Sequence, residues 1–169
     1  MKALVTYLTK TGNTLRIAEA IHEVIPCEKE ILPFDKVDSF DGFDLIFIGF
    51  PVMQFGPPAP ARKLISTHAS GKNIALFITH AMLSNGNDPN QQSMLIKELD
   101  NCRSICSHAN LLGLYHCQGE LSAEIADQLI ASGIPMLMAF AGMQNKTLGH
   151  PNASEIGLAK DFASSFFRK

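Results

Sequence analysis

The chain has 169 residues, of which 46% are hydrophobic and 18% charged, and its formal net charge is −2. This length is enough to bury a core and predicts a single domain over residues 1–169. The near-neutral charge argues against nucleic-acid binding, which needs a concentrated basic surface. No apolar run has the length of a membrane span or the pattern of a secretory signal, so we expect a cytoplasmic protein without membrane contact.

The beginning of the chain predicts a strand, a helix and a second strand. Residues 2–8 are largely apolar, as in a central parallel strand. Residues 13–25 place apolar side chains on one helical face, and Pro26 stops that helix. Residues 28–32 form a short strand whose alternating charges favour an edge position, and a polar, turn-rich stretch follows at 34–42.

The middle of the chain continues this alternation. Residues 44–50 (DLIFIGF) are bulky and β-branched, which predicts a strand buried on both faces. A helix is expected at 59–67, a strand at 73–79, a longer helix at 90–108 and a fifth strand at 110–117.

A last helix begins near Asn152, which forms a capping-box pattern with Glu155. Extra material, roughly 118–151, separates this helix from the fifth strand. Repeated strand–helix units with right-handed crossovers predict an α/β fold. We expect a doubly wound five-stranded parallel sheet in the order 2-1-3-4-5, with an extra helical segment between strand 5 and the last helix.

Ligands of such sheets lie beyond the carboxyl ends of the strands, where the strand order reverses. The relevant loops follow strands 1, 3 and 4 and read TKTGNT, PVMQFGPPAP and HAMLSNGNDPN. The first loop carries the hydroxyl groups of Thr9, Thr11 and Thr14, the amide of Asn13, and Gly12, which lets the backbone approach a ligand closely. Together with the N–H groups of a helix N-terminus, these groups predict a phosphate pocket.

The alternative is that one threonine caps the helix and the others are incidental, but one cap needs only one hydroxyl. Other phosphate-binding designs are missing from the sequence. It has no GxxxxGK[ST] loop, no GxGxxG after the first strand and no Cys-x5-Arg loop.

The run Thr9-Lys10-Thr11-Gly12-Asn13-Thr14 resembles the T-x-T-G-x-T signature of the flavodoxin family, and the resemblance extends over the five-strand core. It implies that this loop holds the 5′-phosphate of flavin mononucleotide (FMN), with Lys10 either reaching the phosphate or pointing to solvent. The resemblance also implies that the loops after strands 3 and 4 enclose the isoalloxazine ring. The cofactor-binding residues expected there are Pro51, Val52, Met53, Gln54, Phe55, Gly56, Thr79, His80, Ala81 and Met82.

The ring loops depart from the usual family pattern, because the chain has no tryptophan and neither tyrosine lies in them. Phe55, Met82 and Leu83 are the candidates for ring contact, and ordinary loop packing is the alternative for Phe55 and Met82. Gly56 either supplies the peptide that turns toward flavin N5 or is a simple turn glycine. His80 either donates to the flavin or relays protons, or it is satisfied by backbone.

Residues 51–61 carry no charge, whereas flavodoxins usually surround the ring with acids, so we expect a less negative reduction potential. Glu120 either contacts a substrate or begins the next helix. The uncharged, methionine-rich stretch 133–144 packs onto the sheet by default, with a lid, a dimer surface or a docking site as alternatives. Cys102 and Cys106 are more typical of idle buried thiols than of a metal site.

Three functions fit the sequence. The first is an FMN-binding electron carrier that shuttles electrons between a reductase and an acceptor enzyme, as a monomer or weak homodimer. The second is an FMN-dependent NAD(P)H reductase of quinones or another small substrate, and the third is a cofactor-free binding module. The sequence favours the carrier over a stand-alone oxidoreductase but does not identify the redox partner.

Overall fold

The computed structural model describes residues 1–53, 55–82 and 89–168. The strands form a five-stranded parallel sheet in the order β2-β1-β3-β4-β5. They are β1 (Lys2–Tyr7), β2 (Glu28–Pro33), β3 (Leu45–Pro51), β4 (Asn73–His80) and β5 (Asn110–Gln118). This order confirms the predicted doubly wound sheet, and β2 lies at its edge as the alternating charges indicated.

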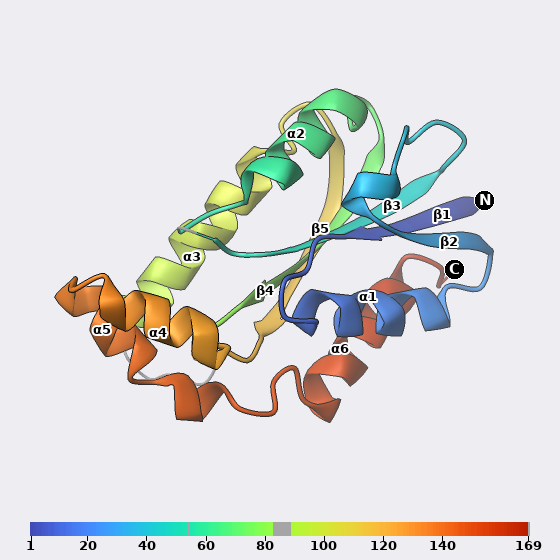
Figure 1. Cartoon of the computed structure of the whole chain (residues 1–169). Helices are drawn as coiled ribbons and strands as arrows, with labels where there is room; N and C mark the ends of the chain where they lie inside the picture. The colour runs from blue at the N-terminus through green and yellow to red at the C-terminus, as the bar shows by residue number, and fades with distance from the viewer. Residues whose placement is uncertain (54, 83–88, 169) are drawn as a thin grey trace.

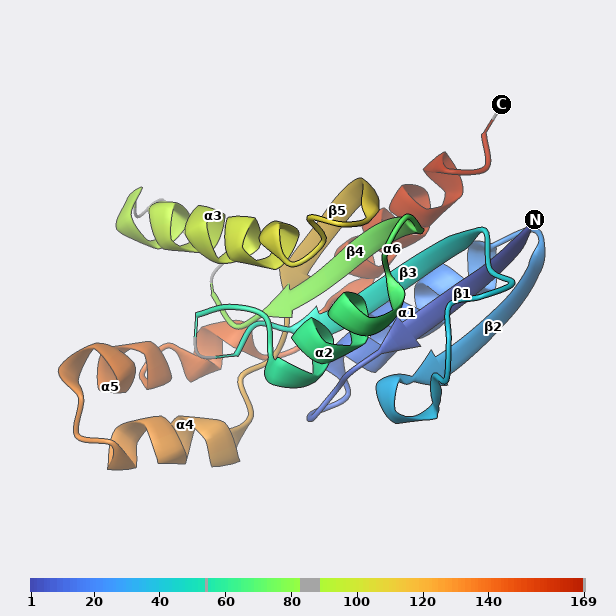
Figure 2. The ribbon, with the colours of Figure 1, turned by 90° about the horizontal axis from the view of Figure 1, so that it is seen from above.

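Helices cover both faces of the sheet, with α2 and α3 on one side and α1 and α6 on the other (Figure 1). The α-helices are α1 (Asn13–Val24), α2 (Ala59–His68), α3 (Pro89–Ser104), α4 (Ala123–Ala131), α5 (Pro135–Ala141) and α6 (Ala153–Ser165), and two 3-10 turns are η1 (Phe34–Lys36) and η2 (Gln144–Thr147). Figure 2 shows α4 and α5 beyond the carboxyl ends of the strands, to which the arrowheads point. These two helices are the predicted extra segment.

The core has one layer on each face of the sheet. Alternate side chains of β3 show the division, because Ile46 and Ile48 face the α2–α3 layer whereas Phe47 faces the α1–α6 layer. All three are fully buried. Burial of such a side chain contributes roughly 1.5–3 kcal/mol, which explains why a strand covered on both faces has no polar alternation.

The closing helix α6 begins with the predicted capping box. The side chain of Asn152 accepts from the backbone N–H of Glu155 at 3.1 Å, and Glu155 Oε2 accepts from the N–H of Asn152 at 2.7 Å. Each group satisfies a donor that the helix leaves unpaired. The aromatic side chains of Phe162 and Phe166 then pack edge-on against Phe47, which fixes α6 on the sheet.

Cys102 and Cys106 are free and buried, consistent with idle thiols. Burial raises the pKa of Cys102 to about 12 and that of Cys106 to about 11. Among the described residues, no helix combines the length and apolar character needed to cross a membrane.

Candidate functional site

The loop between β1 and α1 leaves the start of α1 open. Gly12 is the N-cap residue with φ 90°, and no side chain of the described residues caps the helix, so the threonines do not serve as the simple cap considered above. The N–H of Gly12 donates to Thr9 Oγ1 at 3.0 Å. The N–H groups of Asn13, Thr14 and Leu15 have no acceptor within α1 and none elsewhere in the described residues, so they present open donors at the positive end of the helix.

The exposed side of this loop carries Lys10 and Thr11. A side-chain carbon placed on Gly12 would meet no atom within 4 Å, so open space lies beside the backbone there. The hydroxyl oxygen of Thr11 accepts from Asn13 Nδ2 at 3.2 Å, which leaves the Thr11 hydroxyl hydrogen free to donate. No hydrogen bond or ion pair holds Lys10 among the described residues, as expected of a solvated lysine.

The turn after β5 contacts the loop between β1 and α1. Asn13 Nδ2 also donates to the backbone carbonyl of Glu120 at 2.9 Å. Gly119 comes so close that a side-chain carbon there would lie 2.8 Å from Asn13 Nδ2. The amide of Asn13 is therefore used inside the protein, and its predicted direct role toward a ligand remains a prediction.

Thr14 differs from the other two threonines because its side chain is 1% exposed. Its hydroxyl shares a hydrogen bond of 2.8 Å with the hydroxyl of Thr79, the penultimate residue of β4. The signature loop is thereby joined directly to the strand whose end carries the next predicted loop.

The loop after β3 contains a tight turn in which Met53 and Gly56 exchange backbone hydrogen bonds of 2.9 and 3.2 Å. Phe55 has φ 65° within this turn and is 48% exposed. Both backbone groups of Gly56 are thus engaged, as in a simple turn glycine, and the residue with left-handed backbone is Phe55. Gln54 lies outside the described residues.

Neighbouring elements hold this turn in place. Val52 N–H donates to the carbonyl of Thr79 at 2.9 Å, so the loops after β3 and β4 start side by side. Asn101 of α3 donates to the Phe55 carbonyl at 3.4 Å. Arg62 of α2 donates from Nε to the Pro57 carbonyl at 3.1 Å, which brings a positive charge to a loop whose own residues are uncharged.

The loop after β4 begins with His80, Ala81 and Met82. The His80 side chain is 4% exposed, with Nδ1 3.2 Å from the carbonyl oxygen of Met82 and Nε2 3.0 Å from Nδ1 of His116 on β5. Burial, followed by the charge of His116, lowers the pKa of His80 to about 3. The contact of Nδ1 with the Met82 carbonyl agrees with the alternative in which backbone satisfies His80, whereas Nε2 contacts the side chain of His116. Leu83 lies outside the described residues.

Glu120 does not begin the next helix, and its contact with a substrate remains a prediction. Helix α4 starts after Ser122, whose hydroxyl accepts from Ile125 N–H at 3.3 Å. The Glu120 carboxylate instead accepts from Gly149 N–H at 3.2 Å, and the Glu120 N–H donates to the His150 carbonyl at 3.0 Å. Glu120, before α4, thus forms hydrogen bonds with Gly149 and His150, which follow α5.

Helices α4 and α5 pack against one another around a small cluster that contains Leu121, Ala126 and Ala141, rather than lying flat on the sheet. Ala81 of the loop after β4 contacts this cluster. The end of the connection and the start of α5 expose apolar side chains, with Ile134 at 50% and Met136 of α5 at 54% exposure. The default expectation for 133–144, packing onto the sheet, is therefore wrong, because Ala141 is buried in the cluster with α4 while Ile134 and Met136 stay exposed.

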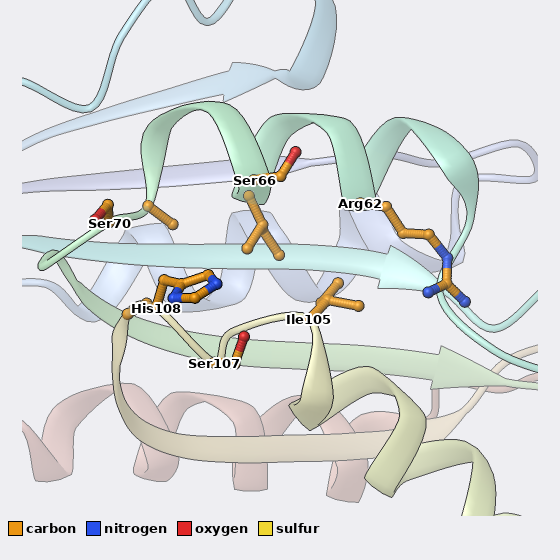
Figure 3. A pocket seen from close by; sticks show the side chains of 9 residues that line it. Arg62, Ser66, Ser70, Ile105, Ser107 and His108 are labelled. Atoms are coloured by element: carbon orange, nitrogen blue, oxygen red, sulfur yellow. The ribbon is translucent and has the colours of Figure 1, made fainter.

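Two surface hollows lie on the α2 side of the sheet. One, of about 570 Å³, is bordered by Thr9 of the signature loop and by Pro33, Phe34 and Lys63. Figure 3 shows the other, of about 410 Å³, with Arg62 near one end and Ser70 and His108 at the other. Neither is lined by Phe55 or Met82, so these hollows are separate from the predicted ring site.

The described parts of the predicted site thus lie together at the carboxyl ends of the strands. The loops after β1, β3 and β4 are joined there by the bonds from Thr14 and Val52 to Thr79. The open N–H groups of α1, the free hydroxyl of Thr11 and the space beside Gly12 suit the phosphate of a nucleotide cofactor. Sequence reasoning missed Arg62, Asn101 and His116, because their roles depend on which helix and strand become neighbours.

A sequence model of the flavodoxin domain matches residues 4–164, so the chain belongs to the flavodoxin domain family. Among curated proteins, it is 29% identical over 182 residues to the flavodoxin-like domain-containing protein BilS of Clostridioides difficile (strain CD3). That match covers 100% of this chain and 98% of BilS.

Solved structures share the fold at low sequence identity. Oxidised Flavodoxin 2 from Bacillus cereus superimposes with a TM-score of 0.57 at 15% identity, over 99% of this chain and 98% of that chain. The azoreductase AzrA gives a TM-score of 0.58 at 13% identity, over 98% of this chain and 100% of that chain. One fold therefore relates the chain to proteins named as a flavodoxin and as an azoreductase.

Proposed function

We propose that this chain binds FMN without a covalent bond and carries electrons between a reductase and an acceptor enzyme. The observation that carries the proposal is the uncapped N-terminus of α1, where Gly12 leaves space beside open N–H groups. Bound FMN would supply the redox chemistry, and the protein would bind it and tune its potential.

The residues would divide this work as follows. Thr9, Lys10, Thr11, Gly12, Asn13 and Thr14 would form the phosphate loop, with Thr11 as a hydroxyl donor and Asn13 and Thr14 acting through their N–H groups. Residues 51–56 and 79–82 would border the ring. Within them, exposed Phe55 would cover one side of the ring, and the buried His80 and Thr79 would hold the loop after β4.

The first experiment is an absorbance spectrum of the purified protein, followed by titration of the flavin-free protein with FMN. We expect Thr11→Ala to weaken FMN binding at least tenfold, because a hydrogen bond to a charged group contributes about 1.5–3 kcal/mol. Thr67→Ala is the control, since Thr67 is an exposed threonine of α2 outside the predicted phosphate loop. Unchanged affinity of Thr11→Ala would reject the phosphate site, and absence of any flavin binding would favour a cofactor-free module.

The second candidate is an FMN-dependent reductase that takes electrons from NADH or NADPH and reduces a quinone or another small substrate. The placement of α4 and α5 beyond the carboxyl ends of the strands favours it, because they add a wall beside the predicted ring site (Figure 2). Steady oxidation of NADH or NADPH with a quinone by the protein alone would favour this enzyme. Reoxidation that requires a partner protein would favour the carrier.

A further inference from the structure

A hydrogen-bonded chain of two histidines runs from β5 to the loop after β4. Nδ1 of His116 lies 3.0 Å from Nε2 of His80, and Nδ1 of His80 lies 3.2 Å from the carbonyl oxygen of Met82. The two rings are tilted by 37° with centroids 5.3 Å apart. His80 is 4% and Met82 7% exposed, while His116 is half-buried.

The chemistry of the groups determines which atom donates in each of the two hydrogen bonds. A carbonyl oxygen only accepts, so His80 Nδ1 must carry a hydrogen and donate it to Met82. A buried imidazole is disfavoured in its charged form, so His80 is neutral and its Nε2 is a bare acceptor. His116 Nδ1 must then carry the hydrogen that His80 Nε2 accepts. One arrangement of hydrogens satisfies both contacts.

Thr79 and His80 also form backbone and hydroxyl hydrogen bonds to neighbouring loops. The Thr79 carbonyl accepts from Val52 N–H at 2.9 Å, and the His80 carbonyl accepts from Gly119 N–H at 2.8 Å. The Thr79 hydroxyl pairs with Thr14. The His80 side chain adds the attachment of Met82, two residues beyond the end of β4, where the backbone enters the predicted ring site.

We propose that His116 is a positioning residue for the predicted ring site. By donating to His80 it stabilises the Nδ1–H tautomer, and that tautomer keeps the Met82 carbonyl turned toward the His80 ring. Without the donor, the Nδ1–H tautomer keeps its bond to the Met82 carbonyl but loses the bond at Nε2, so part of the His80 population carries its hydrogen on Nε2 and faces that carbonyl with an Nδ1 lone pair. Two acceptors at 3.2 Å repel each other, so the Met82 peptide turns away. The consequence for flavin binding rests on the function proposed above.

The tautomer is tested directly by two-bond 15N–1H correlation NMR of histidine-labelled protein without flavin. We expect His80 to show a protonated Nδ1 and an unprotonated Nε2 in the wild type. His116→Asn places an amide donor near the position of Nδ1 and should retain this signature, whereas His116→Leu should show an added population of His80 protonated on Nε2. His108→Leu, which removes an exposed histidine beside the hollow of Figure 3, is the control. A wild-type His80 protonated on Nε2, or a His116→Leu variant with an unchanged His80 signature, would overturn the proposal.

FMN titration supplies the second readout. We expect about fivefold weaker binding in His116→Leu, which corresponds to the loss of one ordinary hydrogen bond, and affinity close to wild type in His116→Asn and His108→Leu. If the wild type binds no FMN but shows the expected tautomers, the flavin assignment fails and the histidine chain stands. If FMN binds equally well to His116→Leu and wild type, the positioning role fails and the flavin assignment stands.

Discussion

The hydroxyl groups of Thr14 and Thr79 lie 2.8 Å apart in the interior and connect the start of α1 to the end of β4. Both side chains are nearly inaccessible, at 1% and 2% exposure. Each hydroxyl has one hydrogen, so one of them donates and the other accepts. This pair couples the phosphate loop to a predicted ring loop inside the protein.

A double-mutant cycle should reveal that coupling. Thr14→Val and Thr79→Val each keep the branched shape but leave one buried hydroxyl without its partner, so each should lower the free energy of unfolding by about 1–3 kcal/mol. The double variant should cost clearly less than the sum, because no hydroxyl is left unpaired. Urea unfolding of the four proteins measures this, and strictly additive effects would show that the hydroxyls do not interact.

The close approach of Gly119 to Asn13 predicts that Gly119→Ala disturbs the phosphate loop. A side-chain carbon there would lie 2.8 Å from Asn13 Nδ2 and displace the bond to the Glu120 carbonyl. We expect a loss of about 1–3 kcal/mol in stability, as for other overpacked sites, together with weaker FMN binding. Gly157→Ala is the matched control, because Gly157 lies on α6 with no atom near its missing side chain. It should raise stability by roughly 0.5–1 kcal/mol through helix propensity. Equal behaviour of the two variants would argue against the steric account.

The sheet and the positions of its loops were predictable because their signals are local. A run such as 44–50 has to be covered on both faces, and the alternation of strands with helices then fixes a parallel order. The signature at Thr9–Thr14 is contiguous, so its place after β1 follows from the sequence. The ends of the elements follow less directly from the sequence. The spacing predicts a helix over 90–108, but α3 ends at Ser104, and Cys106 continues the helical apolar spacing in the turn that follows.

The remaining features depend on long-range neighbours and leave no local pattern. His116 contacts His80 only because β5 lies beside β4 in a particular register. Glu120 looked like a helix-start residue, but its carboxylate bonds to Gly149, twenty-nine positions along the chain. The apolar composition of 133–144 does not specify a contact surface, and in the fold Ala141 packs with α4 while Ile134 and Met136 stay exposed.

The turn at Phe55 predicts a stabilising substitution. Phe55 has φ 65°, a left-handed backbone that costs a non-glycine residue of order 1 kcal/mol or more, and its side chain is 48% exposed. Phe55→Gly should therefore raise the free energy of unfolding by about 1 kcal/mol, whereas Phe55→Ala keeps the strain. Comparison of the two by urea unfolding isolates the backbone effect, and a less stable glycine variant would contradict it.

The charge around the predicted ring loop bears on the reduction potential. Residues 51–61 carry no charge, and Arg62 bonds to the Pro57 carbonyl of the same loop. A positive charge favours the anionic reduced flavin, so we expect a potential less negative than that of flavodoxins with acidic loops. Arg62→Gln should lower the potential by an amount on the order of tens of millivolts. Lys63→Gln, at an exposed position next along α2, should change it less. A redox titration with a very low potential in the wild type would refute this expectation.

Glu98 on α3 predicts a pH-dependent stability. Its side chain is 6% exposed, and Oε2 has no hydrogen-bond partner among the described residues. Burial raises the pKa of this carboxyl above its ordinary 4.5. The native state therefore binds the proton more tightly than the unfolded chain does. The contribution of Glu98 to stability is greatest below pH 4.5 and declines as the pH rises through the raised pKa.

Glu98→Gln should remove this dependence, since the amide stays neutral at every pH. At pH 7 the variant should be more stable than the wild type by about 1 kcal/mol, because the wild type buries a carboxylate oxygen that has no hydrogen-bond partner among the described residues. Below pH 4.5, where Glu98 is protonated in both states, the two proteins should have nearly equal stability. Urea unfolding at the two pH values measures the difference, with Glu19→Gln as the exposed control on α1. An advantage of Glu98→Gln that is the same at both pH values would show that packing, not ionisation, governs this site.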